Sequence, residues 1–269
     1  MSKDIRSMLR TGLQTASKVT KPTSTSTKVN SIEVKNHKGL NVIVPTHPQT
    51  TDFSKRWAID GTHLISNLPP KSYFENRKSF KIAAFDLDGT LVNTKFGLSF
   101  ARGPNDWKWW SPSSREKSSV TTEIKTLLKE DYLLVIFTNQ GGVIADKSKK
   151  SYINFVQRVN AIVEDLKKKL DDDSIDVLVY ASPKRPASGK SSPKELHERM
   201  RKPSTGMWNE MEKFLNTFGS VDKALSFFVG DAAGRPGDHL DSDLMFAREL
   251  EIEFKVPEGI FQHEESNKS

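Results

Sequence analysis

The sequence predicts an α/β fold built on a mostly parallel, doubly wound sheet. From residue 81 onward, short apolar runs alternate with segments of helical periodicity, which is the order of strands and helices in such a sheet. Some of these runs are apolar at every position, as expected of strands buried on both faces. The length of 269 residues suits one domain of this kind with extensions.

The first half of this region predicts two strands and two helices. Residues 81–85 form a short apolar run, and residues 132–137 form a second run without a polar break. Between them, residues 120–129 place three apolar side chains on one helical face, namely Ile124, Leu127 and Leu128. Residues 152–170 carry a longer helical stripe, made of Phe155, Val159, Ile162, Leu166 and Leu170.

The second half continues the alternation. Strands are predicted at residues 176–180, 225–229 and 253–256, and helices at residues 205–218 and 243–250. Strands that are separated by a helix favour right-handed crossovers, which bring successive strands side by side in parallel. The second half therefore supports the same sheet as the first.

The first 50 residues differ in composition from the rest. They are rich in Ser, Thr and Lys and have no sustained period. We therefore expect a basic, mostly disordered tail at residues 1–50 and a folded domain at residues 51–269. Within the tail, residues 3–14 could form a short basic amphipathic helix that serves as a mitochondrial targeting segment, a nuclear signal or a contact for a partner.

The positive charge lies mainly at the N-terminal side. Residues 1–80 contain 13 Lys and Arg against 5 Asp and Glu, whereas the remainder contains 28 against 29. A basic arm beside a near-neutral domain favours an anionic partner such as nucleic acid, and a solvated tail is the competing interpretation. The absence of cysteine excludes disulfides and thiolate chemistry. No apolar run approaches the roughly 20 residues of a membrane span, so we expect no membrane partner. We also expect the protein to be a monomer.

Three of the predicted strands end in polar residues. Asp86 and Asp88 follow the first strand, Thr138 and Asn139 the second, and Asp231 a third. Ligands of open α/β sheets bind beyond the carboxyl ends of the strands, so these side chains are expected to meet in one crevice. Carboxylates without a countercharge repel one another, and a Mg²⁺ ion with oxygen ligands removes that repulsion.

The same residues lie in motifs that occur in a known order. The motifs are Phe85-Asp86-Leu87-Asp88-Gly89-Thr90, Thr138-Asn139-Gln140, Arg201-Lys202-Pro203 and Val229-Gly230-Asp231. Together they resemble the motifs of haloacid-dehalogenase phosphatases, which implies a Rossmann-like α/β domain with a small flap after the first strand. Two longer strings are similar to the phosphatase part of the polynucleotide kinase/phosphatase family, in its phosphatase-only, fungal form: Arg201-Lys202-Pro203-Ser204-Thr205-Gly206-Met207-Trp208 and Val229-Gly230-Asp231-Ala232-Ala233-Gly234-Arg235.

The resemblance implies a role for each matching residue. Asp86 would be the nucleophile that forms an aspartyl-phosphate, and Asp88 would be the general acid and base. Thr138 would hydrogen-bond a phosphoryl oxygen, and Lys202 would neutralise the charge of the phosphoryl group. Mg²⁺ would be held by Asp86, by Asp231 and by the backbone carbonyl of Asp88.

The resemblance also indicates residues that bind the substrate and a further acidic residue. Asn139, Arg201 and Arg235 are expected to bind the substrate, and the two arginines would contact DNA phosphates. Asp243 is the best match to a further aspartate of the family, and it could equally be the N-cap of its helix. Two acidic residues nearby compete with it, namely Asp238 and Asp241.

Two segments keep more than one interpretation. Residues 184–202 hold seven basic and two acidic residues and could be a loop that contacts phosphate or a solvated loop. Three tryptophans lie in the flap region, where at least two are expected to pack in the core and one could stack on a splayed base. These are Trp107, Trp109 and Trp110.

The resemblance implies removal of 3′-phosphate from DNA ends at breaks, nicks or gaps, as a step of DNA repair in the nucleus. No 5′-kinase activity is expected, because Gly189-Lys190-Ser191 lacks the first glycine of a phosphate-binding loop and Pro193 interrupts the following helix. One alternative is a small-molecule phosphomonoesterase of the same superfamily, which the string Ala232-Ala233-Gly234-Arg235 disfavours. Another is a catalytically silent DNA-binding or scaffold protein, which the intact motifs disfavour.

Overall fold

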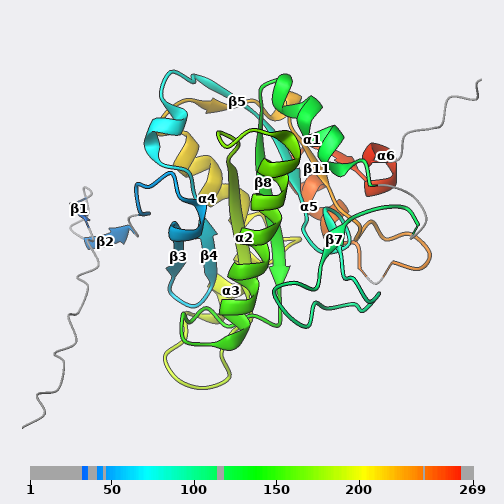
Figure 1. Ribbon diagram of the computed structural model, residues 1–269. Helices are drawn as coiled ribbons and strands as arrows, with labels where there is room; N and C mark the ends of the chain where they lie inside the picture. The colour runs from blue at the N-terminus through cyan, green and yellow to red at the C-terminus, as the bar shows by residue number, and fades with distance from the viewer. Residues whose placement is uncertain (1–31, 36–40, 45–46, 114–117, 239, 262–269) are drawn as a thin grey trace, which may run out of the picture.

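An eight-stranded sheet forms the centre of the computed structural model (Figure 1). The structure describes residues 32–35, 41–44, 47–113, 118–238 and 240–261. Five strands run parallel, in the order β12 (Glu253–Lys255), β11 (Phe227–Val229), β5 (Ser79–Phe85), β8 (Tyr132–Gln140) and β9 (Val177–Pro183). Beyond β9 the sheet continues antiparallel with β4 (Leu64–Asn67) and β3 (Trp57–Asp60), and beside β5 lies the short β10 (Ser220–Val221).

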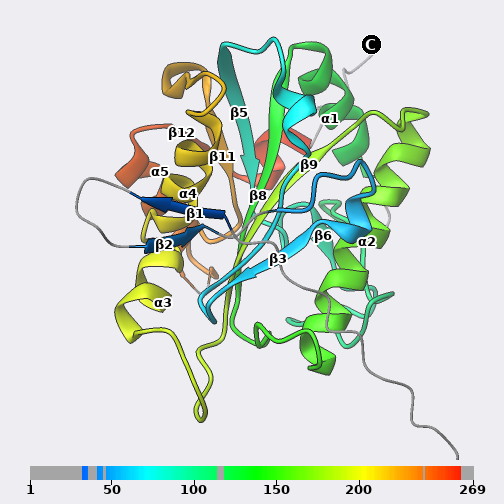
Figure 2. The same cartoon turned by 90° about the vertical axis from the view of Figure 1, so that its left-hand side faces the viewer.

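Helices cover both faces of this sheet (Figure 2). One face is packed by α1 (Val120–Lys129), α2 (Lys150–Leu170) and α6 (Pro257–Phe261). The other face is packed by α3 (Lys194–Met200), α4 (Gly206–Leu215) and α5 (Ser242–Leu250). Strand residues alternate between the two cores, so the predicted doubly wound, mostly parallel fold is confirmed.

Every strand and helix predicted from residue 81 onward is present, with shifted ends. The largest extensions are at β8, which continues through Gln140, and at β9, which continues through Pro183, because Thr138 to Gln140 pair with Ala181 to Pro183. Thr138 and Asn139 are therefore strand residues rather than residues of the following loop. The strand predicted at 225–229 begins only at Phe227, because Lys223–Leu225 form the 3₁₀ turn η3.

Several elements were not among the predictions. These are the β3–β4 hairpin, α3, α6, β10, η1 (Phe53–Lys55), η2 (Lys71–Phe74) and a paired β1 (Ile32–Lys35) and β2 (Asn41–Val44). His47 Nε2 lies 2.8 Å from Ser66 Oγ, so contacts with the domain begin before residue 51. The helix expected at residues 3–14 lies outside the described residues.

A small flap follows β5, as predicted. Its stem is the ribbon of β6 (Val92–Asn93) and β7 (Lys108–Trp109). The stem is joined to the turn after β5, because Gly89 N–H donates to Val92 O at 2.8 Å and Trp110 N–H donates to Leu91 O at 2.9 Å. The flap therefore starts at the first motif itself.

The strand order reverses beside β5. From β5 the chain proceeds outward to β8 and β9, and it then returns to place β11 on the other side of β5. Asp86 N–H donates to Val229 O at 2.8 Å, which ties the end of β5 to the end of β11. Such a reversal opens a crevice at the carboxyl ends of the strands. Within the described residues, no helix has both the length and the apolar character needed to cross a membrane.

Candidate active site

Three buried carboxylates meet at this reversal. Asp86 follows β5, Asp231 follows β11, and Asp243 lies in the first turn of α5. One oxygen of each lies within 4.8 Å of the others. Charges of the same sign at this separation, away from water, require compensation.

Lys202 supplies part of this compensation. Its Nζ lies 2.7 Å from Asp86 Oδ1 and 2.7 Å from Asp243 Oδ1. The residue is only 3% exposed, although it directly follows the surface helix α3 and Arg201. Three ionised carboxylates and one ammonium leave two negative charges, which a divalent cation would balance.

The pKa values of the cluster reflect the same excess of buried negative charge. Burial raises the pKa of Asp86 well above its usual value, the carboxylates of Asp243 and Asp231 raise it further, and Lys202 opposes them. Burial and Asp243 raise the pKa of Asp231 to about 6. Burial acts to lower the pKa of Lys202, but Asp243 and Asp86 outweigh it and the pKa of Lys202 is raised.

The hydrogen bonds show which oxygens remain available to a metal. Among the described residues, Asp86 Oδ2 accepts no hydrogen bond, and the Asp231 carboxylate accepts a long one from Thr90 Oγ1 at 3.4 Å. Both oxygens of Asp243 are engaged, by Lys202 Nζ and by the N–H of Ala232 at 3.1 Å. The cluster therefore fits a divalent-cation site in which Asp86 and Asp231 have free oxygens and Asp243 orients Lys202.

Two glycines let these carboxylates approach so closely. Gly89 has a φ of +87°, and a Cβ at this position would collide with the Asp231 carboxylate. A Cβ at Gly230 would collide with the Asp243 carboxylate. Both glycines of the motifs are thus explained by space at the site.

Asp88 lies beside the cluster and is held by two side chains. Arg158 of α2 donates to Asp88 through both terminal nitrogens, at 2.6 Å and 3.0 Å. Gln140 Nε2 donates to Asp88 Oδ2 at 2.8 Å. Asp88 is still 36% exposed at its side chain, so it is fixed and accessible at once. Sequence reasoning missed Arg158, although a basic residue between Phe155 and Val159 of the apolar stripe was a signal.

Thr138 and Asn139 lie side by side on β8 but have different surroundings. Thr138 Oγ1 accepts a hydrogen bond from Gln140 Nε2 at 2.9 Å, which leaves its hydroxyl proton to donate to a ligand. The Asn139 side chain donates to Lys202 O and accepts from Lys202 N–H, each at 3.0 Å. Asn139, which the motif suggested as a substrate contact, therefore fixes the backbone of Lys202.

The two arginines expected at DNA phosphates are placed differently. Arg201 is exposed and lies over Gly141, where an added Cβ would be 3.5 Å from Arg201 Nη2. Arg235 is instead engaged by acidic partners, since its guanidinium pairs with Asp238 at 3.0 Å and with Glu258 at 3.1 Å. Of these two arginines, Arg201 is the one whose guanidinium has no acidic partner among the described residues.

The acidic residues after Asp231 are now distinguished. Asp238 pairs with Arg235 and accepts from the N–H of Ala233 at 3.1 Å. Asp241 occupies the N-cap position of α5, whereas Asp243 is inside the helix and 2% exposed. The N-cap interpretation of Asp243 is therefore not supported, and Asp243 is the acidic residue that reaches the site.

The basic segment at residues 184–202 is not a single loop, because its second half forms α3. Its first half is tied to the domain at two points. Lys184 N–H donates to Val143 O at 2.7 Å, and Ser192 Oγ lies 2.9 Å from His63 Nδ1 on the β3–β4 turn. The first half is therefore an exposed loop that is anchored at Lys184 and Ser192 and leads into α3.

The three tryptophans of the flap region all pack against the core. Trp110 is buried and contacts the ring of Phe261, with centroids 5.9 Å apart. Trp109 Nε1 donates to Asp165 at 2.6 Å, and Trp107 meets Trp109 edge-on at 5.6 Å. All three tryptophans have packing partners within the domain. These contacts therefore do not support the expectation that one of the three stacks on a base.

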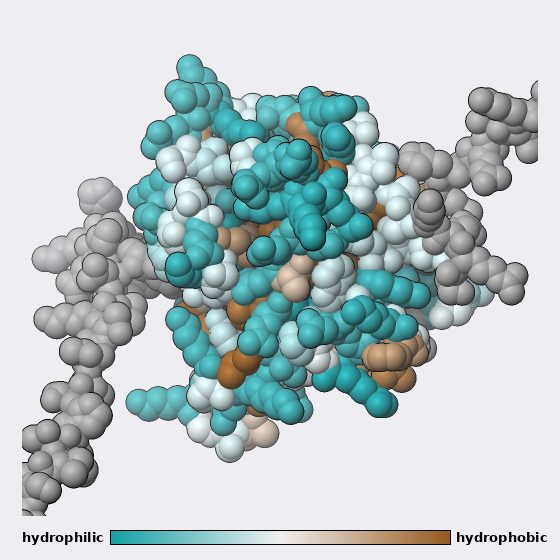
Figure 3. All heavy atoms as spheres, in the orientation of Figure 1, coloured by the Kyte–Doolittle hydropathy of each residue, from teal (hydrophilic) through white to brown (hydrophobic). Residues whose placement is uncertain are grey.

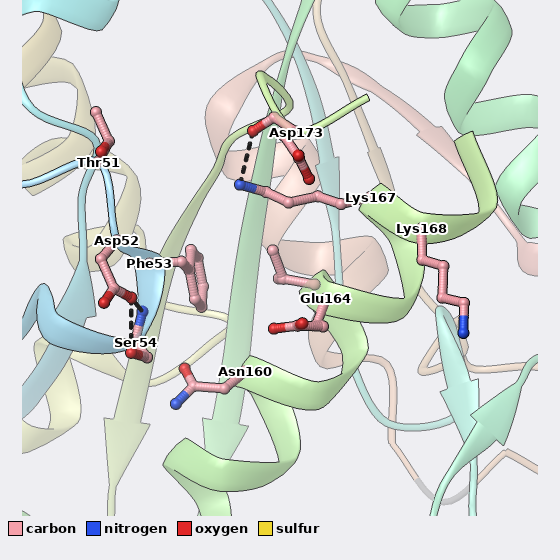
Figure 4. Close-up of a pocket in the computed structure, with 10 residues that line it drawn as sticks. Thr51, Asp52, Phe53, Ser54, Asn160, Glu164, Lys167, Lys168 and Asp173 are labelled. Atoms are coloured by element: carbon pink, nitrogen blue, oxygen red, sulfur yellow. Dashed lines mark hydrogen bonds between the residues drawn. The ribbon is translucent and has the colours of Figure 1, made fainter. Parts of the chain in front are cut away.

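A cavity of about 510 Å³ lies away from the cluster, between η1 and α2 (Figure 4). Its walls carry mixed charges, as at Asp52, Glu164 and Lys167. None of the residues predicted to act in catalysis or binding lines it. The carboxylate cluster, and not this cavity, is therefore the candidate active site.

Comparison with known proteins places the chain in a family. The sequence model described as polynucleotide kinase 3 phosphatase matches residues 81–261, which contain all the site residues above. The chain belongs to this family. The phosphatase class indicated by the motifs is thereby confirmed at the level of the family.

Individual relatives show how much of the chain is shared. The chain is 36% identical over 206 residues to the bifunctional polynucleotide phosphatase/kinase of Schizosaccharomyces pombe, across 77% of this chain and 42% of that protein. It is 31% identical over 220 residues to the polynucleotide 3′-phosphatase of Saccharomyces cerevisiae, across 71% of this chain and 92% of that protein. The chain thus spans less than half of the first relative and most of the second.

Among solved structures, a putative HAD-like phosphatase from Mesorhizobium loti is similar, with a TM-score of 0.47 and 21% identity. The match covers 65% of this chain and 70% of that one.

Proposed function

We propose that this protein removes the 3′-phosphate from DNA ends and leaves a 3′-hydroxyl, in a Mg²⁺-dependent reaction. The observation that carries the proposal is Asp86, a buried carboxylate that Lys202 holds on one oxygen and that accepts no hydrogen bond on the other from the described residues. The polynucleotide 3′-phosphatase relative supports DNA as the substrate. DNA repair is the process that such a reaction serves.

In the first step, the free oxygen of Asp86 attacks the phosphorus atom. The new bond joins Asp86 to phosphorus, and the bond between phosphorus and the 3′-oxygen of the DNA breaks. Asp88 gives its proton to that leaving oxygen, which becomes the 3′-hydroxyl. Arg158 and Gln140 hold Asp88 in position for this transfer.

In the second step, water attacks the phosphorus atom of the aspartyl-phosphate. Asp88 takes a proton from this water, the bond between Asp86 and phosphorus breaks, and inorganic phosphate leaves. Lys202 and the hydroxyl of Thr138 bind the oxygens on which negative charge gathers. Mg²⁺, held by Asp86, Asp231 and the Asp88 carbonyl, would supply further positive charge at these oxygens.

Phosphate release from two labelled oligonucleotides tests this proposal. One oligonucleotide carries a 3′-phosphate and the other a 5′-phosphate, and each is assayed with Mg²⁺ and with EDTA. We expect Mg²⁺-dependent release from the 3′ end only, abolished by Asp86→Asn and unchanged by the exposed control Asp172→Asn. Release from a small phosphate ester but from neither oligonucleotide would favour the small-molecule phosphatase instead.

A separate assay tests the expected absence of kinase activity. Incubation of a 5′-hydroxyl oligonucleotide with ATP should yield no 5′-phosphate.

A nuclear site of action is a separate part of the proposal. It is tested by the position of the fluorescently tagged chain with and without residues 1–31, which also separates a nuclear from a mitochondrial role of that segment.

A further inference from the structure

The flap carries two phenylalanines whose rings are open to solvent. Phe96 is 76% exposed and Phe100 is 85% exposed, the highest values among the large hydrophobic residues that the structure describes. Neither ring packs against another ring of the described residues. Hydrophobic atoms are visible at the lower right of the surface, the side on which the flap lies (Figure 3). Large apolar side chains in such positions usually mark a binding surface.

The backbone of the loop that carries these rings is held in place by hydrogen bonds. The buried carboxylate of Asp106 accepts from the N–H of Lys95 at 3.0 Å and from the N–H of Arg102 at 2.9 Å. Thr94 Oγ1 donates to Leu98 O at 2.7 Å. Three hydrogen bonds thus shape the backbone on both sides of the phenylalanines. Rings presented on a preorganised loop lose little conformational entropy when they bind a ligand.

The loop also lies close to the site. The stem of the flap starts at Val92, whose carbonyl is bonded to Gly89 of the first motif. Four residue steps separate Val92 from Phe96, a span of at most about 14 Å. At about 3.4 Å of rise per nucleotide, that span corresponds to roughly four nucleotides of a strand. In Figure 1 the flap lies at the end of the sheet where β8 ends.

The charge of the loop matches a nucleic acid. Lys95 and Arg102 flank the two phenylalanines and are exposed, whereas the carboxylate of Asp106 is turned to backbone N–H groups. Exposed aromatic rings between cations are the arrangement that binds single strands by stacking and by phosphate contact. The tryptophans nearby are packed against the core and leave this role to the phenylalanines.

We propose that Phe96 and Phe100 form a stacking platform for bases of the DNA strand whose 3′-phosphate occupies the site. This inference rests on the proposed function. The platform binds any base, because every base has a stacking face, and it positions the last few nucleotides while Asp86 reacts with the terminal phosphate.

The test combines variants with modified substrates. Phe96→Ala, Phe100→Ala and the double variant are compared with Leu225→Ala, an equally simple truncation of an exposed hydrophobic residue on η3. Substrates are a 3′-phosphorylated single strand, the same strand with abasic sites in its last four nucleotides, and a small phosphate ester. We expect the double variant to raise KM for the normal strand at least about fivefold, the lower range for stacking on one base.

Three further results are expected. The double variant has the native KM for the small ester. The abasic strand has the same KM with the native protein and with the double variant. Phe96→Trp, unlike Phe96→Ala, binds the normal strand with the native KM. The loss from the variant and the loss from the abasic sites are then not additive, as expected of partners in one contact.

Other outcomes overturn the inference. An unchanged KM on the normal strand, or equal losses on the strand and the small ester, would show that the rings do not stack on bases. A change of oligomeric state without a change of KM would assign the surface to a second copy of the chain. If the native protein releases phosphate from the small ester but not from DNA, the proposed function fails and the platform fails with it.

Discussion

Asn139 and Lys202 are joined by two hydrogen bonds of 3.0 Å that link a strand side chain to the backbone of a residue 63 positions away. The amide of Asn139 donates to the carbonyl of Lys202 and accepts from its N–H. The side chain of Lys202 continues from this anchor to Asp86 and Asp243. The position of the ammonium group therefore depends on a residue that does not touch it.

This relationship predicts how Asn139 contributes to the reaction. Asn139→Ala should lower kcat by about 10- to 100-fold, because a displacement of about 1 Å at a reacting group has costs of this order. KM for the oligonucleotide should change little. Steady-state kinetics on the 3′-phosphorylated strand measure both values. A variant with a raised KM and a native kcat would instead make Asn139 a direct contact of the substrate, as its motif suggested.

Lys202 predicts a link between activity and stability. Lys202→Met should abolish phosphate release, and in EDTA it should lower the free energy of unfolding by about 3–5 kcal/mol, because it leaves buried carboxylates without their countercharge. Mg²⁺ should restore part of this loss. Urea unfolding with and without Mg²⁺ measures the effect, and Lys194→Met, on the exposed face of α3, is the matched control. Equal stability of the two variants in EDTA would contradict the electrostatic account of the cluster.

We predict that Arg158 contributes to the reaction through Asp88. Arg158→Lys retains the charge but loses the paired geometry, and it should lower kcat by about 10²- to 10⁴-fold, the contribution of a positioned acid or base. The double variant of Arg158→Lys with Asp88→Asn should be no slower than Asp88→Asn alone. Single-turnover assays of the three proteins establish this. Additive losses would show that Arg158 acts on the substrate and not through Asp88.

The pKa of Asp231 predicts how the metal-free protein responds to pH. Its folded pKa of about 6 lies above the ordinary 3.8, so the stability from this group is complete below about pH 4. That stability is lost as the pH rises through 6. Asp231→Asn should therefore lower the melting temperature less at pH 7.5 than at pH 4.5 when EDTA is present. Thermal unfolding at the two values measures this difference.

Comparison with the variant is needed because another group titrates in the opposite direction. Burial lowers the pKa of His47 to about 4 from 6.5, so the stability from His47 is lost as the pH falls through this range. Asp231→Asn leaves His47 in place, and the difference between the two proteins isolates Asp231. A variant whose melting temperature differs from the native value by the same amount at both pH values would contradict the prediction.

Sequence alone predicted the parts of the site that depend on strand ends. The apolar runs before Asp86 and Asp231 are continuous, and parallel strands bring their carboxyl ends to one edge, so the two carboxylates were expected to meet. The β3–β4 hairpin was missed, although Asp60-Gly61 between apolar stretches is a turn signal. Its strands are short, and a hairpin that joins the edge of a parallel sheet does not change the alternation of strands and helices from which the sheet was predicted.

Contacts between distant side chains were beyond sequence reasoning. Arg158 was visible as a basic residue on an apolar helix face, but its pairing with Asp88 depends on how α2 lies across the sheet. Asn139 was assigned from its motif to the substrate, because the motif does not show that the backbone of Lys202 lies within reach. Phe96 and Phe100 carry no periodic signal at all, since they lie in an irregular loop.

The reversal of strand order beside β5 has a consequence for biosynthesis. A nascent chain that has emerged as far as β9 already holds Asp86, Asp88 and Thr138, but it has neither Lys202 nor Asp231. Lys202 follows α3 and becomes available to Asp86 first, whereas Asp231 reaches the site only when β11 pairs with β5, a contact between residues far apart in sequence. The cluster of buried carboxylates is therefore incomplete in an unfinished polypeptide until α5, which carries Asp243, has been synthesised.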